Sequence, residues 1–264
     1  MGIFNPPIAG PNVGVWWHGC HLRRDPVVGA GPVIAALGGA ETFGRFMDRP
    51  YPDKRADLLG VSVLNLAMLH SGVDSYQHAV SVLDCAHGCA AVVFECPDVR
   101  KSSNSYYSVH RSRNDRVIGL HPPFLDMFAG LDMMRVGFVG DLWRRCQRHD
   151  PDATGQMMAD ITASSCKTWS DFVRSFEKPS VTVSFATTAS PVRSVDGIDH
   201  VQIPQSDEQA SLRGFTVAGD DRVVARSMAG QSAHDLAARS LARRLAVDVI
   251  RPARGSAYGP LKAS

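Results

Sequence analysis

The pattern of apolar positions along the chain predicts short buried strands that alternate with amphipathic helices. Five mainly apolar runs have the length of strands and end at glycine, proline or polar residues. They cover residues 33–37, 61–66, 90–94, 181–185 and, more weakly, 200–203. Helical spacing of apolar residues predicts helices within residues 73–86, 122–148, 155–177 and 233–249. A further short extended piece is expected at residues 223–225.

This alternation predicts one doubly wound α/β domain of three layers. Parallel strands need crossover connections, and these are usually helical, so we expect a mostly parallel five-stranded sheet with helices on both faces. The chain shows no internal repeat and no stretch with the composition of a linker. We expect an irregular N-terminal arm over residues 1–30, the domain over residues 31–250 and a loose tail over residues 251–264.

The composition indicates a globular protein. Hydrophobic residues make up 44% of the chain and charged residues 20%, which excludes collagen-like and wholly disordered classes. The net charge of +2 is too small for binding nucleic acid through bulk charge. No run approaches the about eighteen apolar residues of a membrane span, and the first residues lack a basic leader. We therefore expect a cytoplasmic protein with no nucleic-acid and no membrane partner.

The six cysteines are scattered along the chain, which favours reduced thiols over a disulfide framework. Cys85, His87 and Cys89 are side chains that suit zinc. A Cys-x3-Cys spacing between a helix end and a strand is, however, more typical of two small buried apolar side chains. The sequence therefore predicts no metal site, and no segment of it indicates a cofactor.

Candidate chemistry gathers in the turns that follow the predicted strands, where open parallel sheets bind ligands. The first strand is followed by G-G-A-E-T-F-G (residues 38–44) and the second leads into N-L-A-M-L-H-S-G-V-D (65–74). The third is followed by a polar segment, predicted to be a loop over residues 97–116, that contains S-N-S-Y-Y-S-V-H-R-S-R-N-D-R. A histidine, His234, stands at the start of the last predicted helix.

In their order, these segments resemble the blocks of the SGNH (GDSL-type) hydrolase superfamily. The first of them is similar to that of a bacterial branch that usually reads G-G-T-E-T-Y-G. The resemblance spans about residues 31–247 and is specific between residues 38 and 116. It implies the α/β fold described above and an origin in ester hydrolysis or acyl transfer. The superfamily uses a serine of the first block as nucleophile and a D-x-x-H block for its histidine.

Most catalytic positions of the superfamily carry other residues in this chain. The first block aligns on its T-x-G, which puts Gly39 at the position of the aspartate and Ala40 at that of the serine nucleophile. Ala67 replaces the oxyanion glycine, and Asn104 is the asparagine nearest to the third block. Gln231 replaces the aspartate of the last block. Among the polar members, only the histidine is kept.

Three residues are candidates for the chemistry that remains. His234 matches the histidine of the superfamily and could act as a base, or it could bond the backbone at the start of its helix. Thr42 could supply a hydroxyl nucleophile, or it could cap the helix that begins there. Glu41 could act as an acid or base, or it could form an ion pair with Arg113 or Arg116.

The densest group of polar and aromatic side chains lies in the predicted loop after the third strand. Aromatic faces beside amide and guanidinium donors suit a saccharide or an anionic group, whereas the same side chains could also bond one another in an ordered lid. Arg100 and Lys101 lie close to this site and could attract an anionic ligand. The predicted binding residues are Gly39, Ala40, Ala67, Asn104, Tyr107, His110, Arg113 and Asn114.

The expected function is binding of a small polar ligand, saccharide-like or acylated. Ester hydrolysis or acyl transfer would use His234 as base and Thr42 or a bound water as nucleophile, with oxyanion donors near Ala40, Ala67 and Asn104. The alternative is a binding or interaction protein that keeps the scaffold without the nucleophile. Convergence of Glu41, Thr42 and His234 on one cavity would favour catalysis, and a pocket filled by the tyrosines of the loop would favour binding.

Overall fold

The computed structural model confirms the doubly wound α/β architecture. It describes residues 15–18, 20–23, 31–47, 49–134, 136–185, 195–204 and 228–245. The strands of the central sheet are β3 (Val33–Leu37), β4 (Ser62–Asn65), β5 (Ala91–Glu95), β8 (Ser180–Phe185) and β9 (Asp199–Ile203). All neighbours in the sheet are parallel, in the order β4-β3-β5-β8-β9. The direction of strand order reverses between β3 and β5, which is the topological switch point of such a sheet.

The central strands β3 and β5 are nearly continuous apolar runs because helices cover both faces of the sheet. Successive side chains of a strand point to opposite faces. In β3, Val33, Ala35 and Leu37 belong to one hydrophobic cluster, whereas Ile34 belongs to the other. The two clusters are the two interfaces between the sheet and its helical layers.

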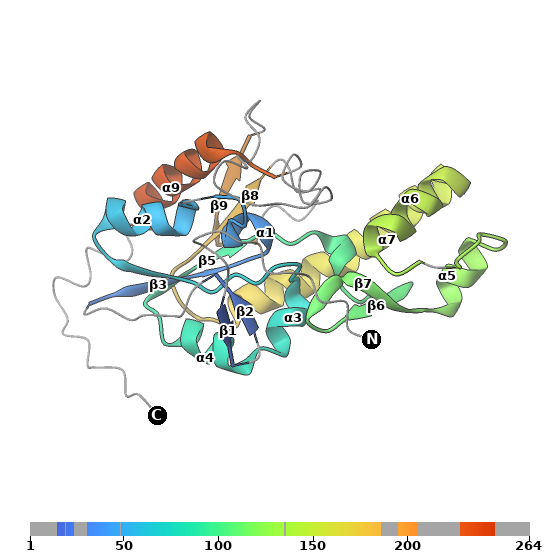
Figure 1. The fold of residues 1–264 in the computed structure, drawn as a ribbon, viewed down its shortest axis with the longest axis horizontal. Coiled ribbons are helices and arrows are strands. Elements are labelled where there is room, and N and C mark those ends of the chain that lie inside the picture. The colour runs from blue at the N-terminus through green and yellow to red at the C-terminus, as the bar shows by residue number, and fades with distance from the viewer. Residues whose placement is uncertain are drawn as a thin grey trace.

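The helical layers follow from these clusters (Figure 1). One face is covered by α2 (Tyr51–Leu59) and α9 (Gln231–Leu245). The opposite face is covered by α3 (Val73–Gln77), α4 (Val80–His87) and the long α7 (Pro151–Arg174). The single helix predicted over residues 73–86 is thus divided in two between Gln77 and Val80.

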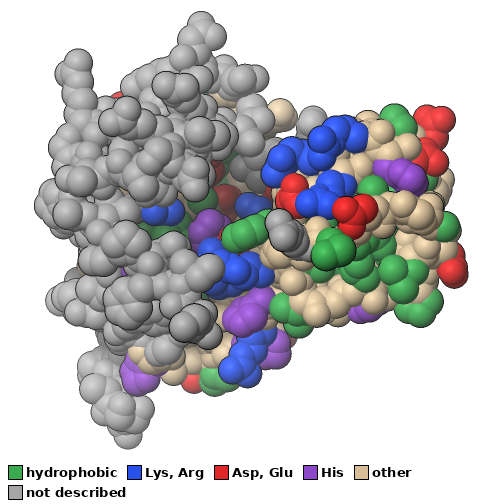
Figure 2. Space-filling view, turned by 45° about the vertical axis from the view of Figure 1, so that its right-hand side comes forward, with side chains coloured by type: hydrophobic (Ala, Val, Ile, Leu, Met, Phe, Trp, Pro, Cys, Tyr) green, Lys and Arg blue, Asp and Glu red, His purple; other side chains and the backbone are tan. Residues whose placement is uncertain are grey.

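A separate lobe extends beside the sheet (Figure 1). It consists of the antiparallel hairpin β6 (Tyr107–His110) and β7 (Arg113–Leu120), with α5 (Pro122–Met127) and α6 (Val139–His149). Figure 2 shows hydrophobic side chains (green) on the surface at the right-hand side of the view. Within the lobe, Ile118, Leu125, Met134 and Phe138 are exposed. The helix predicted through residues 122–148 is interrupted between α5 and α6.

The prediction of a loop over residues 97–116 is wrong, because a short 3₁₀ turn, η1 (Val99–Lys101), and most of the β6–β7 hairpin occupy this segment. Tyr107 and Val109 are buried while Ser108 and His110 are not, which is the period of two of a strand. The Tyr107 hydroxyl donates to the Arg100 carbonyl oxygen (2.7 Å) and accepts from the Trp143 indole nitrogen (2.9 Å). Tertiary contacts of this kind stabilise a strand whose sequence is mostly polar.

The described part of the predicted irregular arm is an antiparallel ribbon of β1 (Val15–Trp17) and β2 (Cys20–Leu22), so this prediction is corrected. Leu22 is fully buried in the core. The Arg23 guanidinium donates to the carbonyl oxygens of Phe43 (3.0 Å), Gly44 and Met47 (2.6 Å). The extended piece expected at residues 223–225 and the tail over residues 251–264 lie outside the described residues.

The zinc alternative at Cys85 and Cys89 is not supported by their environment. The Cys89 thiol donates to the Cys85 carbonyl oxygen, and burial raises the pKa of this thiol to about 12. Within the described ranges, no three His, Cys, Asp or Glu side chains gather in a way that could hold a metal ion. Nor does any helix in those ranges have the length and apolar character needed to cross a membrane.

Candidate functional site

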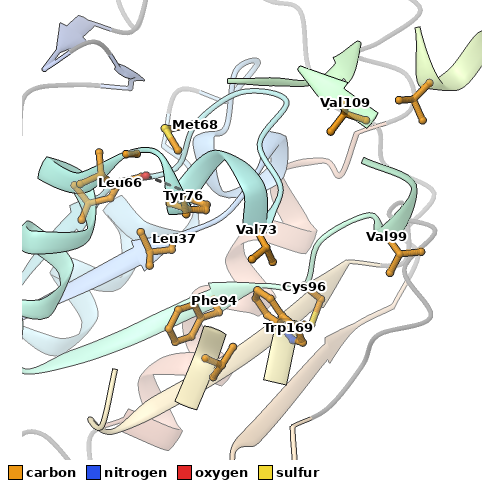
Figure 3. Packing of buried hydrophobic residues seen from close by; sticks show 14 of the residues in the cluster. Leu37, Leu66, Met68, Val73, Tyr76, Phe94, Cys96, Val99, Val109 and Trp169 are labelled. Carbon is orange, nitrogen blue, oxygen red and sulfur yellow. Dashed lines mark hydrogen bonds between the residues drawn. The ribbon is translucent and has the colours of Figure 1, made fainter. Parts of the chain in front are cut away.

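A cavity of about 340 Å³ opens at the carboxyl ends of β3, β4 and β5. Its wall is formed by the turns after these three strands, with aromatic side chains of α7 on one side. This is the switch point at which doubly wound sheets bind ligands, so the sequence predicted its place. Leu37, Val73, Phe94 and Trp169 form its apolar part (Figure 3). The Phe94 and Trp169 rings meet edge to face, with centroids 5.9 Å apart.

The turn after β3 brings Glu41 to this cavity. Glu41 lies in the short helix α1 (Ala40–Phe43), lines the cavity and is 5% exposed. Both of its carboxylate oxygens accept from the Ala229 amide, at 3.1 and 3.2 Å. Its Oε2 lies 3.8 Å from Nε2 of His234, at the start of α9. The turn after β3 and the start of α9, nearly two hundred residues apart in sequence, therefore meet beside the cavity.

His234 stands behind Glu41. Its side chain is fully buried, and its ring packs against the rings of Tyr51 and Phe185. The Tyr51 amide donates to Nδ1 (3.2 Å). Because an amide can only donate, Nδ1 carries no proton, and the proton of the ring sits on Nε2, the atom that faces Glu41. The group presented to the cavity is thus Glu41, whereas the sequence pointed to His234 as the base.

The ion pair expected between Glu41 and an arginine of the third segment is not formed. The Arg113 guanidinium donates to the Asp115 carboxylate (3.0 and 3.3 Å). The Arg116 guanidinium lies over the Phe138 ring, 4.6 Å from its centroid. Both arginines interact within the lobe, whereas Glu41 is bound by the Ala229 amide.

Thr42 fills neither role predicted for it. Its hydroxyl donates to Glu95 Oε2 (2.6 Å) and contacts the Tyr51 hydroxyl (2.9 Å). The side chain is fully buried and is not part of the cavity wall, so it cannot reach a ligand as a nucleophile. The helix has Gly39 at its N-cap and no side-chain cap, so Thr42 does not cap it either.

Glu95, the last residue of β5, is a site residue that the sequence analysis did not identify. Its Oε2 accepts from the amides of Gly39 (2.9 Å) and Thr42 (2.8 Å), besides the Thr42 hydroxyl. Burial raises the pKa of this carboxyl. Glu95 is the one charged residue of the otherwise apolar strand β5, and it stands at the carboxyl end, where ligands bind. This position was the signal in the sequence that could have identified it.

Most of the amides predicted to line the ligand site already donate to side chains of the protein. Ala67 is buried outside the cavity wall, and its amide donates to Asn65 Oδ1 (3.2 Å). The Gly39 amide is bound by Glu95. Ala40 borders the cavity, and its amide has no acceptor among the described residues. Of the predicted amides, that of Ala40 is the one available to a ligand.

Asn104 stabilises its own turn instead of serving as an oxyanion donor. Its Oδ1 accepts from the amides of Tyr106 (2.9 Å) and Tyr107 (3.2 Å), and its Nδ2 donates to the Ser102 carbonyl oxygen (2.9 Å). Asn104 and Tyr107 are absent from the described wall of the cavity. These two predicted binding residues are therefore structural.

The remaining predicted binding residues of the hairpin also act within the protein. Asn114 is fully buried; its Oδ1 accepts from the Gly72 amide (2.6 Å) and the Ser75 hydroxyl (2.7 Å). Its Nδ2 donates to the carbonyl oxygen of His110 (2.9 Å), whose exposed ring accepts from the Ser112 amide. Neither residue nor Arg113 lines the cavity as described. Asn114 instead holds Gly72 in the cavity wall, which agrees with the alternative of an ordered segment.

Further titratable groups of the cavity come from the turns after β4 and β5. His70 has a left-handed backbone (φ 59°), its Nδ1 lies 3.8 Å from Asp115 Oδ2, and burial lowers its pKa to about 4. Arg100 binds Asp98 through two hydrogen bonds of 2.8 Å. Lys101 also lines the cavity, as its position in the sequence predicted. The cavity thus combines carboxylates, a lysine and an aromatic wall.

Fold and site together define a doubly wound α/β protein with a ligand-sized cavity at its switch point. Residues 20–201 match the family described as Domain of unknown function (DUF6473). This match covers more than half of the chain, which therefore belongs to that family. No curated protein and no solved structure matches the chain. Glu41, Glu95 and Lys101 lie inside the matched segment, whereas His234 lies beyond it.

Proposed function

We propose that the protein is an SGNH-hydrolase-like enzyme that hydrolyses a small, partly apolar ester with a water molecule activated by Glu41. The observation that carries the proposal is the Glu41 carboxylate on the cavity wall with His234 Nε2 3.8 Å behind it. In the alignment with the superfamily, Glu41 directly follows the position of the missing serine. In this proposal the reaction takes place at the same position as in the superfamily, but the reacting group is the Glu41 carboxylate instead of a serine hydroxyl.

The surroundings of Glu41 suit a general base. The Ala229 amide and His234 contact the carboxylate oxygens, so the carboxylate keeps one orientation in the cavity wall. Glu41 takes a proton from water as the water oxygen attacks the ester carbonyl. The ester C–O bond then breaks, and the proton returns from Glu41 to the leaving alkoxide. In this mechanism the Ala40 amide, which has no acceptor among the described residues, donates to the developing oxyanion.

Direct attack by water is favoured over an acyl-enzyme because no hydroxyl in the described wall of the cavity is activated by a base. Alanine stands at the position of the serine, and the Thr42 hydroxyl is bound to Glu95. Ser71 does line the cavity, but its hydroxyl is within hydrogen-bond distance of the carbonyl oxygens of Gly38 (2.9 Å) and Met68 (2.8 Å). A carbonyl oxygen is no base for activating a nucleophile.

A panel of p-nitrophenyl esters with acyl chains of increasing length tests the proposal. We expect steady release of p-nitrophenol without a burst, an unchanged intact mass during turnover and no inactivation by a fluorophosphonate. These results follow from attack by water, because no covalent intermediate accumulates. A stable acyl adduct or a fluorophosphonate adduct would contradict the mechanism.

A second candidate function is ligand binding without catalysis, favoured by the same alanine at the position of the serine. A ligand that binds only the folded protein raises its melting temperature. Stabilisation by esters and by their hydrolysis products, with no ester consumed, would establish this alternative. Stabilisation together with turnover supports the hydrolase.

A further inference from the structure

One carboxylate oxygen of Glu95, Oε1, is left to bind a ligand in the cavity. The residue is 7% exposed, and the three donors from Gly39 and Thr42 all bind its Oε2. Oε1 accepts no hydrogen bond from any described residue, while Glu95 lines the cavity. A carboxylate has about four lone-pair sites on its two oxygens, so Oε1 is left for a ligand. A buried carboxyl oxygen with this free capacity is stabilised by a hydrogen-bond donor.

Lys101 is the cation that the cavity offers to a ligand. It lines the cavity and forms no ion pair with the described residues. Its neighbour Arg100 is already neutralised by two hydrogen bonds to Asp98. Lys101, Glu95 and His70 line the same cavity, and the Lys101 charge acts to lower the pKa of the other two. His70 itself is neutral at physiological pH because burial lowers its pKa to about 4.

Besides Glu95 and Lys101, the cavity has an aromatic surface. Phe94, the residue before Glu95 in β5, lies near Trp169 of α7 (Figure 3). Phe172 of α7 lines the same cavity. The Phe172 ring lies 5.9 Å from the Phe94 ring and 6.1 Å from the Trp169 ring, centroid to centroid. Such a wall favours an apolar or aromatic portion of a ligand through burial of its surface.

We propose that Glu95 Oε1 and Lys101 Nζ are the two poles of a recognition site for a zwitterionic ligand with an apolar portion. The ammonium group of the ligand binds Glu95, its carboxylate or phosphate binds Lys101, and its apolar portion contacts Phe94 and Trp169. The inference rests on the proposed function only in placing the ligand in this cavity; it does not require turnover. Charge-assisted hydrogen bonds at both poles give the preference over ligands that carry one charge.

Isothermal titration calorimetry with three related probes tests the inference. Phenylalanine carries both charges, 3-phenylpropionate lacks the ammonium group and phenethylamine lacks the carboxylate. We expect phenylalanine to bind at least tenfold more tightly than either of the other two. Similar affinities for all three probes, or no heat from phenylalanine at millimolar concentration, would overturn the inference.

Two variants test whether Glu95 binds the ammonium group of the ligand and whether Lys101 binds its carboxylate. Glu95→Gln is expected to reduce phenylalanine affinity to that of 3-phenylpropionate and to leave 3-phenylpropionate affinity unchanged. Lys101→Met is expected to reduce phenylalanine affinity to that of phenethylamine and to leave phenethylamine affinity unchanged. The exposed Glu177→Gln and Lys167→Met are matched controls with wild-type affinity. Unchanged phenylalanine binding in Glu95→Gln or Lys101→Met removes that pole.

If Glu95→Gln does not fold, Gly39→Ala tests the same pole. A Cβ at Gly39 would lie 3.5 Å from Glu95 Oε1, in ordinary contact, and would cover this oxygen without a clash. We expect weaker binding of phenylalanine and phenethylamine and an unchanged affinity for 3-phenylpropionate. Preferential phenylalanine binding in a protein that hydrolyses no ester would retain the zwitterion site and refute the hydrolase. Ester turnover without preferential phenylalanine binding would retain the hydrolase and refute the zwitterion site.

Discussion

Glu41→Gln lowers the rate constant of ester hydrolysis by about 10²–10⁴-fold, the usual contribution of a general base. Glutamine has the same shape as glutamate and its oxygen can still accept from the Ala229 amide, but it cannot take a proton from water. The site should therefore remain assembled while the chemical step fails. We expect kcat to fall and KM to stay close to the wild-type value, in steady-state assays with the best ester of the panel.

The exposed Glu177→Gln is the control for a lost carboxylate, and it should keep the wild-type rate. Calorimetry on Glu41→Gln should give an ester affinity close to the wild-type KM, since hydrolysis no longer consumes the ligand. A Glu41→Gln enzyme with full activity would remove Glu41 from the mechanism. Loss of ligand affinity with kcat retained would make Glu41 a binding residue.

Gly38→Ala destabilises the protein by about 1–3 kcal/mol, the cost of overpacking a close-packed site. A Cβ at this position would lie 2.4 Å from Thr42 Oγ1 and 2.5 Å from Glu95 Cβ. Thr42 and Glu95 are hydrogen-bonded to each other and cannot move apart without breaking that contact. The measurement is urea unfolding followed by circular dichroism, with the midpoint and slope fitted for each variant.

The neighbouring Gly39→Ala supplies the control. The closest atoms to its added Cβ would be 3.5 and 3.6 Å away, so we expect a stability within about 0.5 kcal/mol of wild type. Two adjacent glycines should thus differ: Gly38 is required for packing, whereas Gly39 has room for a methyl group. Equal stabilities of the two variants would mean that Glu95 and Thr42 do not sit against Gly38.

The elements with strong apolar periodicity were the predictable part of the fold. The strand expected over residues 33–37 has the bounds of β3, and the other predicted strands of the sheet differ by a residue or so at their ends. A run buried on both faces shows in the sequence because every position is apolar. The β6–β7 hairpin did not show, because Tyr107 and Asn114 are buried through hydrogen bonds to distant residues.

The place of the site was predictable, and the direction of its side chains was not. The rule that ligands bind at the carboxyl edge located Gly39, Ala40 and Glu41 correctly on the cavity. Whether Glu41 or His234 faces the cavity depends on the packing of α9 against α2. In the sequence Glu95 is only the end of a predicted strand. Its hydrogen bond to Thr42 depends on the close packing of both side chains against Gly38, which only the structure shows.

Mapping of amide chemical shifts tests most directly whether the cavity beside Glu41 is where the ligand binds. The measurement is a ¹H–¹⁵N correlation spectrum of the Glu41→Gln protein with and without the best ester, which this variant does not consume. We predict the largest shifts at the amides of Gly39, Ala40, Gly72 and Lys101, which border the cavity. Shifts confined to the β6–β7 hairpin, with those four amides unchanged, would contradict the account.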